Sequence, residues 1–471
     1  MHATAQFTLG QTELKPATAL GEMAASLGFD DVPASARLRG KLSILDALGV
    51  GLASNAFPYA DRALAGIAAL AGAAGGACSV LGRSERLPVR DAALANGILI
   101  HGLDFDDTHL PSIVHPTAAC LPCALSLGEA LGVDGRTFLT AYFAGMETAV
   151  RVGAAVRGGF HHVGFHATGI VAHFSSAVIA AKLLGLDARK IVEAQGMAAS
   201  TASGVQVFLE EGAWTKRFHP GWAAVAGITA AYLAQADFKG PSRPYEGRFG
   251  LFDTHLQGKA NDVDLDIMVA DLGQRWHFAD TALKPYPVCH FIHGCADAAI
   301  ELGGLVDIDD IASVEAFLPR DTMPIVAEPA HAKERPSTDY EAKFSAQFVV
   351  ATCLIKRRFN LPELQDDALR HPQVRDLATR VKCSIDPASA FPEFFSGGVR
   401  IVLKDGRELF RHVRVNSGAG ERALDTEAVA AKFMASASLA VDEARAASVR
   451  DIVLDLENRS VAELAAALRA A

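Results

Sequence analysis

The sequence lacks the features that mark several large classes of protein. Its N-terminus, MHATAQFTLGQTELKPATAL, has no basic start followed by an apolar block, so we expect no signal peptide. The formal net charge of the 471 residues is −10. This argues against a general nucleic-acid or membrane partner, because such partners need clustered lysine and arginine. Apolar windows such as residues 63–80 are built from alanine and glycine, which is typical of a buried helix in a soluble protein.

Cysteine is scarce and poorly placed for metal binding. Cys120 and Cys123 form a CxxC motif, but no second pair matches it, which disfavours a zinc site or a redox dithiol. An iron–sulfur hydratase needs three or four positioned thiolates, and the other cysteines are scattered singly. We therefore expect reduced thiols in a cytoplasmic protein.

What the sequence does contain is a long helical signal. Half of its residues are hydrophobic, which is ample for a large core, and the length predicts two or three domains. From about residue 15 to 240, apolar residues recur at three- and four-residue spacing, most clearly over 35–54, 137–156 and 169–186. No repeat of 20–50 residues is visible, so a solenoid is not expected.

The sequence pattern changes after about residue 280, from helical periodicity to a mixture of strand and helix signals. Residues 311–319 predict a strand, 344–359 a helix, and 397–415 a hairpin that alternates on both sides of an Asp-Gly turn. The C-terminus is helical again. We predict a mainly α protein with an α+β lid: a helical domain made of residues 1–281 and 416–471, and an inserted α+β domain made of residues 282–415.

The segment HGLDFDDTHLPSIVHP, residues 101–116, concentrates polar groups in an apolar chain. If a helix continues through residue 108, His101, Asp104 and Thr108 share one face. The proline that follows would end this helix, and His115 is pushed toward an extended conformation by the proline after it. The alternative is a turn in which Asp and Thr bind backbone amides. Two histidines in the same loop favour a site.

Glycines bracket three histidines in GGFHHVGFHATG, residues 158–169. His162 and His166 are four residues apart and would bind zinc on a helix, but the glutamate of the HExxH motif is absent. A general acid or base, or a donor to a bound anion, is the interpretation we favour for His161, His162 and His166.

Two basic segments follow. In EEGAWTKRFHPGWAA, residues 210–224, we expect Lys216, Arg217 and His219 to lie just before an alanine-rich helix, where free amides and cations make an anion site. The alternative is an ordinary basic loop. In ALKPYPVCHFIHGCADAAI, residues 282–300, the lysine, tyrosine and two histidines lie at the expected domain junction. A rigid linker is the alternative there, and both interpretations can hold together.

These segments together resemble the MmgE/PrpD family, which includes 2-methylcitrate dehydratase, cis-aconitate decarboxylase and iminodisuccinate epimerase. The resemblance is carried by LRGKLSILDALGVGLA, ANGILIHGLDFDDTH, GFHATG, WTKRFHPGWAA, LKPYPVCHFIH, YEAKFSAQFVVA and VRIVLKDGRE. It implies a helical domain, a smaller α+β lid and a homodimer.

The resemblance also implies the site residues, which are Asp104, Thr108, His115, His166, Lys216 and Lys284. We assign His115 as the leading acid/base, Asp104 as the group that orients or charges it, and His166 as second proton donor or substrate ligand. Thr108, Lys216, Lys284 and His219 would bind substrate carboxylates. No metal and no cofactor is expected.

The predicted function is a cofactor-independent lyase acting on a di- or tricarboxylate, with dehydration of the 2-methylcitrate type preferred over decarboxylation or epimerisation. The cis-aconitate decarboxylases carry a lid tyrosine where this chain has Ile325 or Val326, which counts against that reaction. Two alternatives of other classes are a zinc hydrolase using His162 and His166, and a non-catalytic carboxylate-binding protein.

Overall fold

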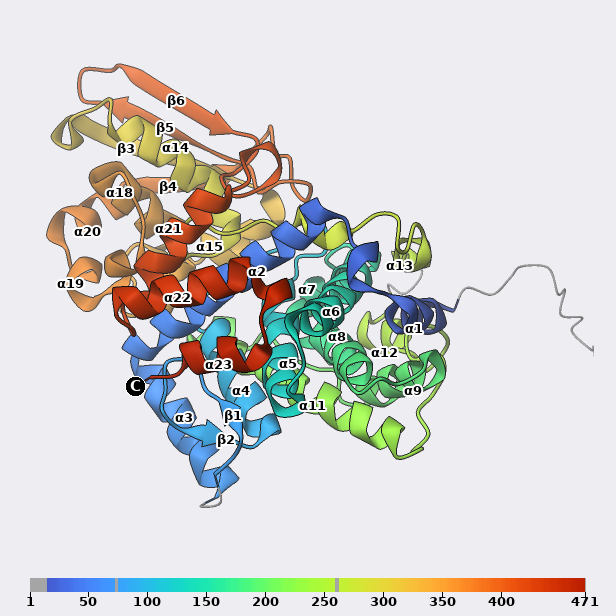
Figure 1. Cartoon of the computed structure of the whole chain (residues 1–471). Coiled ribbons are helices and arrows are strands. Elements are labelled where there is room, and N and C mark those ends of the chain that lie inside the picture. The colour runs from blue at the N-terminus through green and yellow to red at the C-terminus, as the bar shows by residue number, and fades with distance from the viewer. Residues whose placement is uncertain (1–14, 73–74, 259–261, 471) are drawn as a thin grey trace, which may run out of the picture.

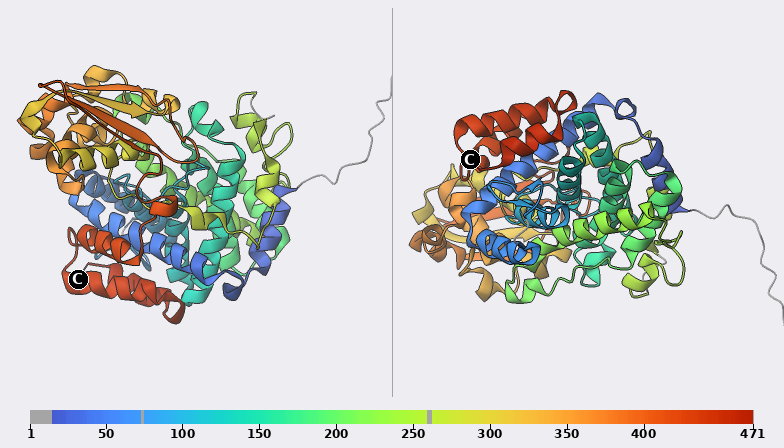
Figure 2. Two further views of the ribbon diagram at one scale, coloured as in Figure 1. Left: turned by 90° about the horizontal axis from the view of Figure 1, so that it is seen from above. Right: turned by 60° about the horizontal axis from the view of Figure 1, so that its bottom comes forward.

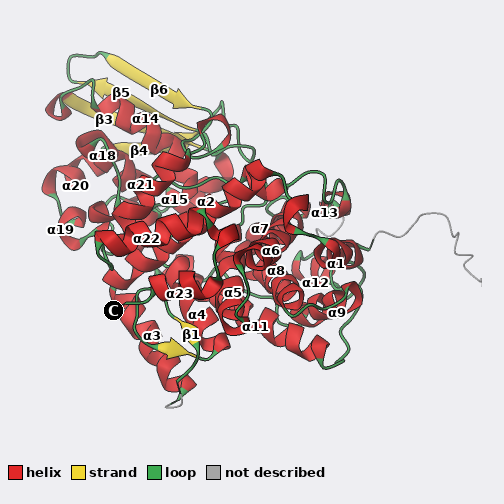
Figure 3. Cartoon of the chain, viewed as in Figure 1, coloured by secondary structure: helices red, strands yellow, loops and turns green. Residues whose placement is uncertain are grey.

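The computed structural model describes residues 15–72, 75–258 and 262–470. The fold is mainly helical with a smaller α+β part, as predicted (Figure 1, Figure 3). Every helix in these ranges is too short or too polar to span a membrane. The four-stranded sheet lies at one end of the molecule and the N-terminal helix α1 at the other (Figure 2).

The N-terminal half contains the longest helices. The predicted helices over 35–54, 137–156 and 169–186 are confirmed within a few residues as α2, α6 and α8. The elements are α1 (Pro16–Ser26), α2 (Ala34–Ala53), α3 (Pro58–Ala71), β1 (Cys78–Ser79), β2 (Arg86–Leu87), α4 (Val89–Ile100), α5 (Pro116–Leu131), α6 (Gly135–Ala155), α7 (Gly159–His162), α8 (Ala167–Leu183), α9 (Ala188–Ala199), α10 (Phe208–Glu211), α11 (Thr215–Gln235), α12 (Leu251–His255) and α13 (Leu265–Val269).

The central helix of this half is α8, whose residues are all buried except Lys182. Helices α5, α6, α9 and α11 pack around it, and α11 also crosses α4. At that crossing two glycines meet: a Cβ added to Gly97 would lie 2.3 Å from the Cα of Gly221. The close approach fixes the start of α11 beside the end of α4, where the candidate site lies.

One apolar segment does not form the single helix that was predicted for it. Residues 63–80 were expected to form one buried helix, but α3 ends at Ala71 and Cys78–Ser79 form a short strand. Gly72 has a φ angle of 75°, which ends the helix in the left-handed conformation that glycine tolerates.

The second half holds the sheet. Its elements are α14 (His293–Gly303), β3 (Ile311–Leu318), α15 (Met323–Val326), α16 (Ala330–Lys333), α17 (Asp339–Lys343), α18 (Ala346–Lys356), α19 (Asp366–Leu369), α20 (Pro372–Ala378), β4 (Val381–Ile385), β5 (Gly397–Leu403), β6 (Glu408–Val413), α21 (Thr426–Ala437), α22 (Glu443–Leu454) and α23 (Val461–Leu468). The strand order is β4-β3-β5-β6, parallel between β3 and β4 and antiparallel elsewhere.

The strand, helix and hairpin expected in this half are confirmed. Gly406 takes a φ angle of 88° in the turn between β5 and β6. Helix α14 packs on β5 and β6, and α18 packs on α14 and β4. Helix α21 returns to α2 in the helical half (Figure 1). The domain limits at residues 281 and 415 stay a prediction.

Candidate active site

The segment between α4 and α5, residues 101–115, is a loop and not the helical continuation that we expected. Helix α4 ends at Ile100, and Asp104 has a φ angle of 54°, which a continuous right-handed helix excludes. Aspartate is one of the few residue types that tolerate this left-handed conformation. His101, Asp104 and Thr108 therefore do not share a helix face. Asp104 and Thr108 nevertheless line the same cavity.

Buried hydrogen bonds hold this loop in place. His101 Nδ1 lies 2.8 Å from a carboxylate oxygen of Asp106, and Asp107 accepts hydrogen bonds from the first turn of α5. The main chain of Thr108 exchanges two hydrogen bonds with Ala282, at 2.8 and 2.9 Å. The loop is thereby joined to the segment that leads into the lid.

Asp104 is the electrostatic centre of the site. Its Oδ1 accepts hydrogen bonds from Lys216 Nζ and Lys284 Nζ, both at 2.9 Å, and Lys284 also binds the main-chain oxygen of Asp104 at 2.8 Å. Burial alone would raise the pKa of Asp104, but the two ammonium groups outweigh it and hold that pKa well below its ordinary value. Burial likewise lowers the pKa of Lys284, and the Asp104 charge outweighs it and raises that pKa. Two cations thus meet one anion.

His115 stands at the N-terminus of α5 with one ring nitrogen engaged. Its Nδ1 donates to the main-chain oxygen of Asp107 at 2.7 Å, which leaves the lone pair on Nε2. Nε2 lies 3.9 Å from Asp104 Oδ1. Burial, opposed by the charge of Asp106, holds the pKa of His115 well below its ordinary value. The ring is therefore neutral near pH 7, with Nε2 able to accept a proton.

His166 stands at the N-terminus of α8, close to two other imidazoles. Its Nδ1 lies 3.1 Å from Nδ1 of His219, and its ring stacks on His101 at 5.4 Å between centroids. Nε2 of His166 is buried and has no protein partner among the described residues. His166 lines the cavity, whereas His219 is behind it and contacts His166 instead. The geometry therefore does not support the direct role in substrate binding that we expected for His219.

The cations of the WTKRFHP segment lie inside α11 and not before it, which corrects the expectation from the sequence. The helix begins at Thr215 and continues through Pro220, so Lys216 is in its first turn. Arg217 points away from the cavity: its guanidinium lies 4.0 Å from the ring centre of Tyr59 and donates to the main-chain oxygen of Gly102. Of Lys216, Arg217 and His219, only Lys216 lines the cavity.

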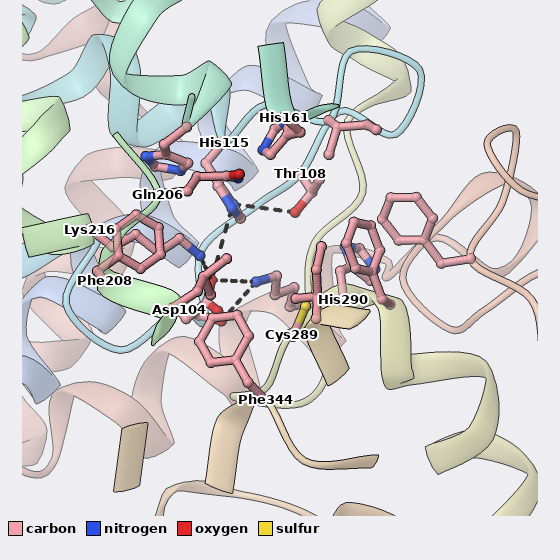
Figure 4. A pocket seen from close by; sticks show the side chains of 17 residues that line it. Asp104, Thr108, His115, His161, Gln206, Phe208, Lys216, Cys289, His290 and Phe344 are labelled. Carbon is pink, nitrogen blue, oxygen red and sulfur yellow. Dashed lines mark hydrogen bonds and ion pairs between the residues drawn. The ribbon is translucent and has the colours of Figure 1, made fainter. Parts of the chain in front are cut away.

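These groups surround one cavity with an empty volume of about 530 Å³ (Figure 4). Its lining residues are Asp104, Thr108, Ile113, His115, His161, His166, Gln206, Phe208, Leu209, Lys216, Lys284, Cys289, His290, Phe291, Ile325, Phe344 and Phe395. Both halves of the chain contribute to the lining. Lys216, His115 and Asp104 lie on the helical side, and the phenylalanines 291, 344 and 395 belong to the lid.

Of the predicted site residues, six line this cavity: Asp104, Thr108, His115, His166, Lys216 and Lys284. Gln206 and the apolar lining residues other than Ile325 were missed, because no chemical motif marks them. A larger cavity adjoins it and shares Ile113, His161, Phe291 and Ile325 with it. His162 lines only that outer cavity and is exposed.

In the part of the chain that the structure describes, the groups of three or more residues that could hold a metal ion lie in this same cluster. Among the described residues, His101, His115 and His166 offer nitrogens within 4.8 Å of one another, and so do Asp104, Asp106 and His115 with their ligand atoms. His162, one of the two ligands expected for a zinc hydrolase, belongs to neither group. Two lysine ammonium groups on Asp104 and the engaged Nδ1 of His115 oppose a dication there. All seven cysteines are free.

Comparison with known proteins identifies both halves of the chain. The model of the MmgE/PrpD N-terminal domain matches residues 18–264, and that of the MmgE/PrpD C-terminal domain matches residues 286–458. A cis-aconitate decarboxylase of Aspergillus terreus is 27% identical over 461 residues, covering 92% of this chain and 91% of that protein. The human cis-aconitate decarboxylase is 29% identical over 390 residues, covering 79% and 78%. A cis-aconitate decarboxylase-like protein of Aspergillus oryzae is 26% identical and covers 99% and 97%.

Proposed function

The chain belongs to the MmgE/PrpD family, and from this premise we propose that it is a cofactor-independent lyase acting on a small di- or tricarboxylate. One observation carries the proposal: the ammonium groups of Lys216 and Lys284 and the free Nε2 of His115 meet at Asp104 in one cavity. Removing a carboxylate from water costs several kcal/mol unless cations and donors replace its hydration. The two lysines supply that charge.

The same lysines would assist the chemistry. A C–H bond beside a carboxylate is weakly acidic, and its cleavage places negative charge on the carboxylate oxygens. Lys216 and Lys284 stabilise that enediolate-like charge as it develops. His115, neutral at rest, takes the proton on Nε2, and Asp104 stabilises the imidazolium that results. General acid–base steps of this kind contribute roughly 10²–10⁴-fold each.

Dehydration is the reaction that this resting state favours, because a neutral His115 begins as a base. The proton goes from carbon to Nε2 of His115, and the electron pair forms the C=C bond. The β-hydroxyl takes that proton back from the His115 imidazolium and leaves as water, with a hydrogen bond from His166 to hold it. Ile325 lines the cavity, in the region where the resemblance places a tyrosine in the decarboxylases. An apolar side chain in place of that tyrosine also favours dehydration over decarboxylation.

Decarboxylation of a cis-aconitate-like substrate is the second candidate, and the names of the relatives favour it. Here the C–C bond to a carboxylate breaks, CO2 leaves, and the electron pair moves into the conjugated carboxylate that the lysines hold. The negative charge of bound substrate raises the pKa of His115, which then delivers a proton to carbon. Epimerisation would return the proton to the opposite face of the same intermediate.

Proton NMR of purified protein with cis-aconitate, 2-methylcitrate and iminodisuccinate in D2O distinguishes the three reactions. Dehydration produces an olefin and water, decarboxylation produces a terminal methylene group, and epimerisation incorporates deuterium without loss of either. A ligand that stabilises the protein against heat without any of these changes would instead indicate a non-catalytic binding protein. Activity that disappears with EDTA and returns with zinc would support the metal alternative.

We also propose a cytoplasmic location and a homodimer. The first turns of α11 and the residue before it support the dimer: Trp214, Phe218 and Trp222 are each about 40% exposed, and the last two stack at 5.6 Å between ring centroids. Large apolar side chains grouped on one surface are typical of a protein interface. Light scattering should give twice the mass of one chain. A Trp222→Glu variant should dissociate, and a monomeric wild-type protein would contradict the dimer.

A further inference from the structure

His290 lies on the lid side of the cavity and has no role in the mechanism described above. It begins a short 3-10 turn, His290–Ile292, directly before α14. Only 4% of the residue is exposed to solvent, and its ring lines the cavity beside Cys289 (Figure 4). Its ring also lies close to that of Phe395, at 5.1 Å between centroids.

Asn416 determines which nitrogen of His290 carries the proton. The main-chain N–H of Phe395 donates to Asn416 Oδ1 at 3.2 Å, which fixes the orientation of the amide. The amide nitrogen, Nδ2, is therefore the atom that faces His290 Nε2, at 2.9 Å. Because Nδ2 can only donate, Nε2 must accept. The neutral ring of His290 then carries its hydrogen on Nδ1.

That Nδ1–H group is buried and has no protein partner among the described residues. The ring stays neutral, because burial first, and then the positive charge of Lys284, lower the pKa of His290 against the opposing charge of Asp104. Buried donors in folded proteins are almost always paired. An unpaired donor on a ring that lines a cavity is the arrangement expected when a ligand supplies the acceptor.

We propose that His290 binds the substrate: its Nδ1–H donates a hydrogen bond to an oxygen of the bound carboxylate compound, from the lid side of the cavity. Asn416 is a positioning residue that keeps the proton on Nδ1. The proposal rests on the proposed function, because it takes the occupant of the cavity to be an oxygen-rich acid. Phe395 packs against the ring at 5.1 Å and against Phe291 at 5.0 Å between centroids, so apolar rings lie beside this donor in the cavity wall.

Two variants test the assignment in different ways. His290→Phe keeps a ring and removes the donor. Asn416→Asp still accepts the Phe395 N–H, but its second oxygen must accept a hydrogen from His290 Nε2, so the neutral ring presents a lone pair on Nδ1. His293→Phe is the matched control, because the His293 ring contacts that of His290 at 4.3 Å between centroids but does not line the cavity.

Isothermal titration with cis-aconitate at pH 8 should show a Kd raised about tenfold in His290→Phe and by at least as much in Asn416→Asp. His293→Phe should bind as the wild type does. At pH 6 the imidazolium of Asn416→Asp carries a hydrogen on both nitrogens, so its affinity should recover, and that of His290→Phe should not. A purely structural role of Asn416 would not produce this pH-dependent recovery.

Unchanged affinity in His290→Phe, or wild-type affinity of Asn416→Asp at pH 8, would overturn the proposal. Nitrogen-15 NMR of histidine-labelled protein checks the tautomer without any ligand: the signals lost in His290→Phe should report a hydrogen on Nδ1, and a hydrogen on Nε2 would also overturn it. A wild-type protein that binds cis-aconitate but catalyses none of the three reactions would contradict the proposed function and leave this inference standing.

Discussion

Lys216 and Lys284 hold the same carboxylate oxygen, Asp104 Oδ1, each at 2.9 Å. One lysine comes from the first turn of α11 and the other from the segment that leads into the lid. Two ammonium groups at this separation repel each other, and Asp104 makes the arrangement stable by lying between them. The pair thus retains an excess positive charge that an anionic substrate can share.

Removal of the Asp104 charge should therefore damage both folding and activity. In Asp104→Asn the two buried ammonium groups lose their shared partner, which should lower the free energy of unfolding by about 3–5 kcal/mol and reduce kcat/KM at least 100-fold. Urea denaturation and turnover measure the two effects. Asp339→Asn is the control, since Asp339 binds Lys343 and Arg217 outside the cavity. Equal losses of activity in both variants would contradict the central role of Asp104.

The packing of α4 against α11 should control the position of Lys216. In Gly97→Ala the new Cβ would lie 2.3 Å from the Cα of Gly221, so the helices must separate. We expect a loss of about 1–3 kcal/mol in unfolding free energy, together with reduced activity. Gly66→Ala on α3 meets no atom within 4 Å and should leave both unchanged or slightly improved. Thermal denaturation of the two variants gives the comparison.

Buried neutral histidines predict the pH dependence of stability. Burial lowers the pKa of His173 and of His219 to about 4, below the 6.5 of an unfolded chain. The unfolded state therefore binds more protons between pH 6.5 and 4, and each histidine should remove about 1.4 kcal/mol of stability per pH unit as the pH falls through that window. Urea denaturation at pH 7, 6 and 5 measures the slope.

His173→Gln should reduce that slope by one proton, and the same substitution at the exposed His162 serves as the control. The charge of Asp104 affects the stability of the fold at lower pH. Its pKa lies well below the ordinary value, so its stabilisation is complete above about pH 4 and is lost only as the pH falls further. A stability that rises as the pH falls from 6.5 to 5 would contradict the assignment of neutral buried histidines.

Much of the architecture could be predicted from the sequence, because periodicity and turn chemistry are local signals. The helix α6 and the hairpin around Gly406 follow directly from them. The loop after α4 could not, because the pattern of His101, Asp104 and Thr108 also fits a helix face. Its actual path depends on buried contacts with distant residues, such as the main-chain bonds between Thr108 and Ala282.

The candidate site was predictable where a chemical motif marked it and unpredictable elsewhere. Lys216 and Lys284 were expected to converge, and they do. The prediction that Lys216 lies before the helix was wrong, because α11 begins at Thr215 and continues through Pro220. The role of Asn416 gave no signal in the sequence, since its hydrogen bond to His290 joins segments that are far apart in the chain.

The most direct test of the account is the fate of the substrate proton in a His115→Gln variant. Proton NMR in D2O with 2-methylcitrate and cis-aconitate should show turnover by the wild type and a loss of at least 100-fold in the variant, with unchanged thermal stability. His109→Gln, in the same loop but bonded to Ser112 and outside the cavity, should remain active. A folded His115→Gln protein that turns over substrate at the wild-type rate would contradict the claim that this imidazole moves the proton.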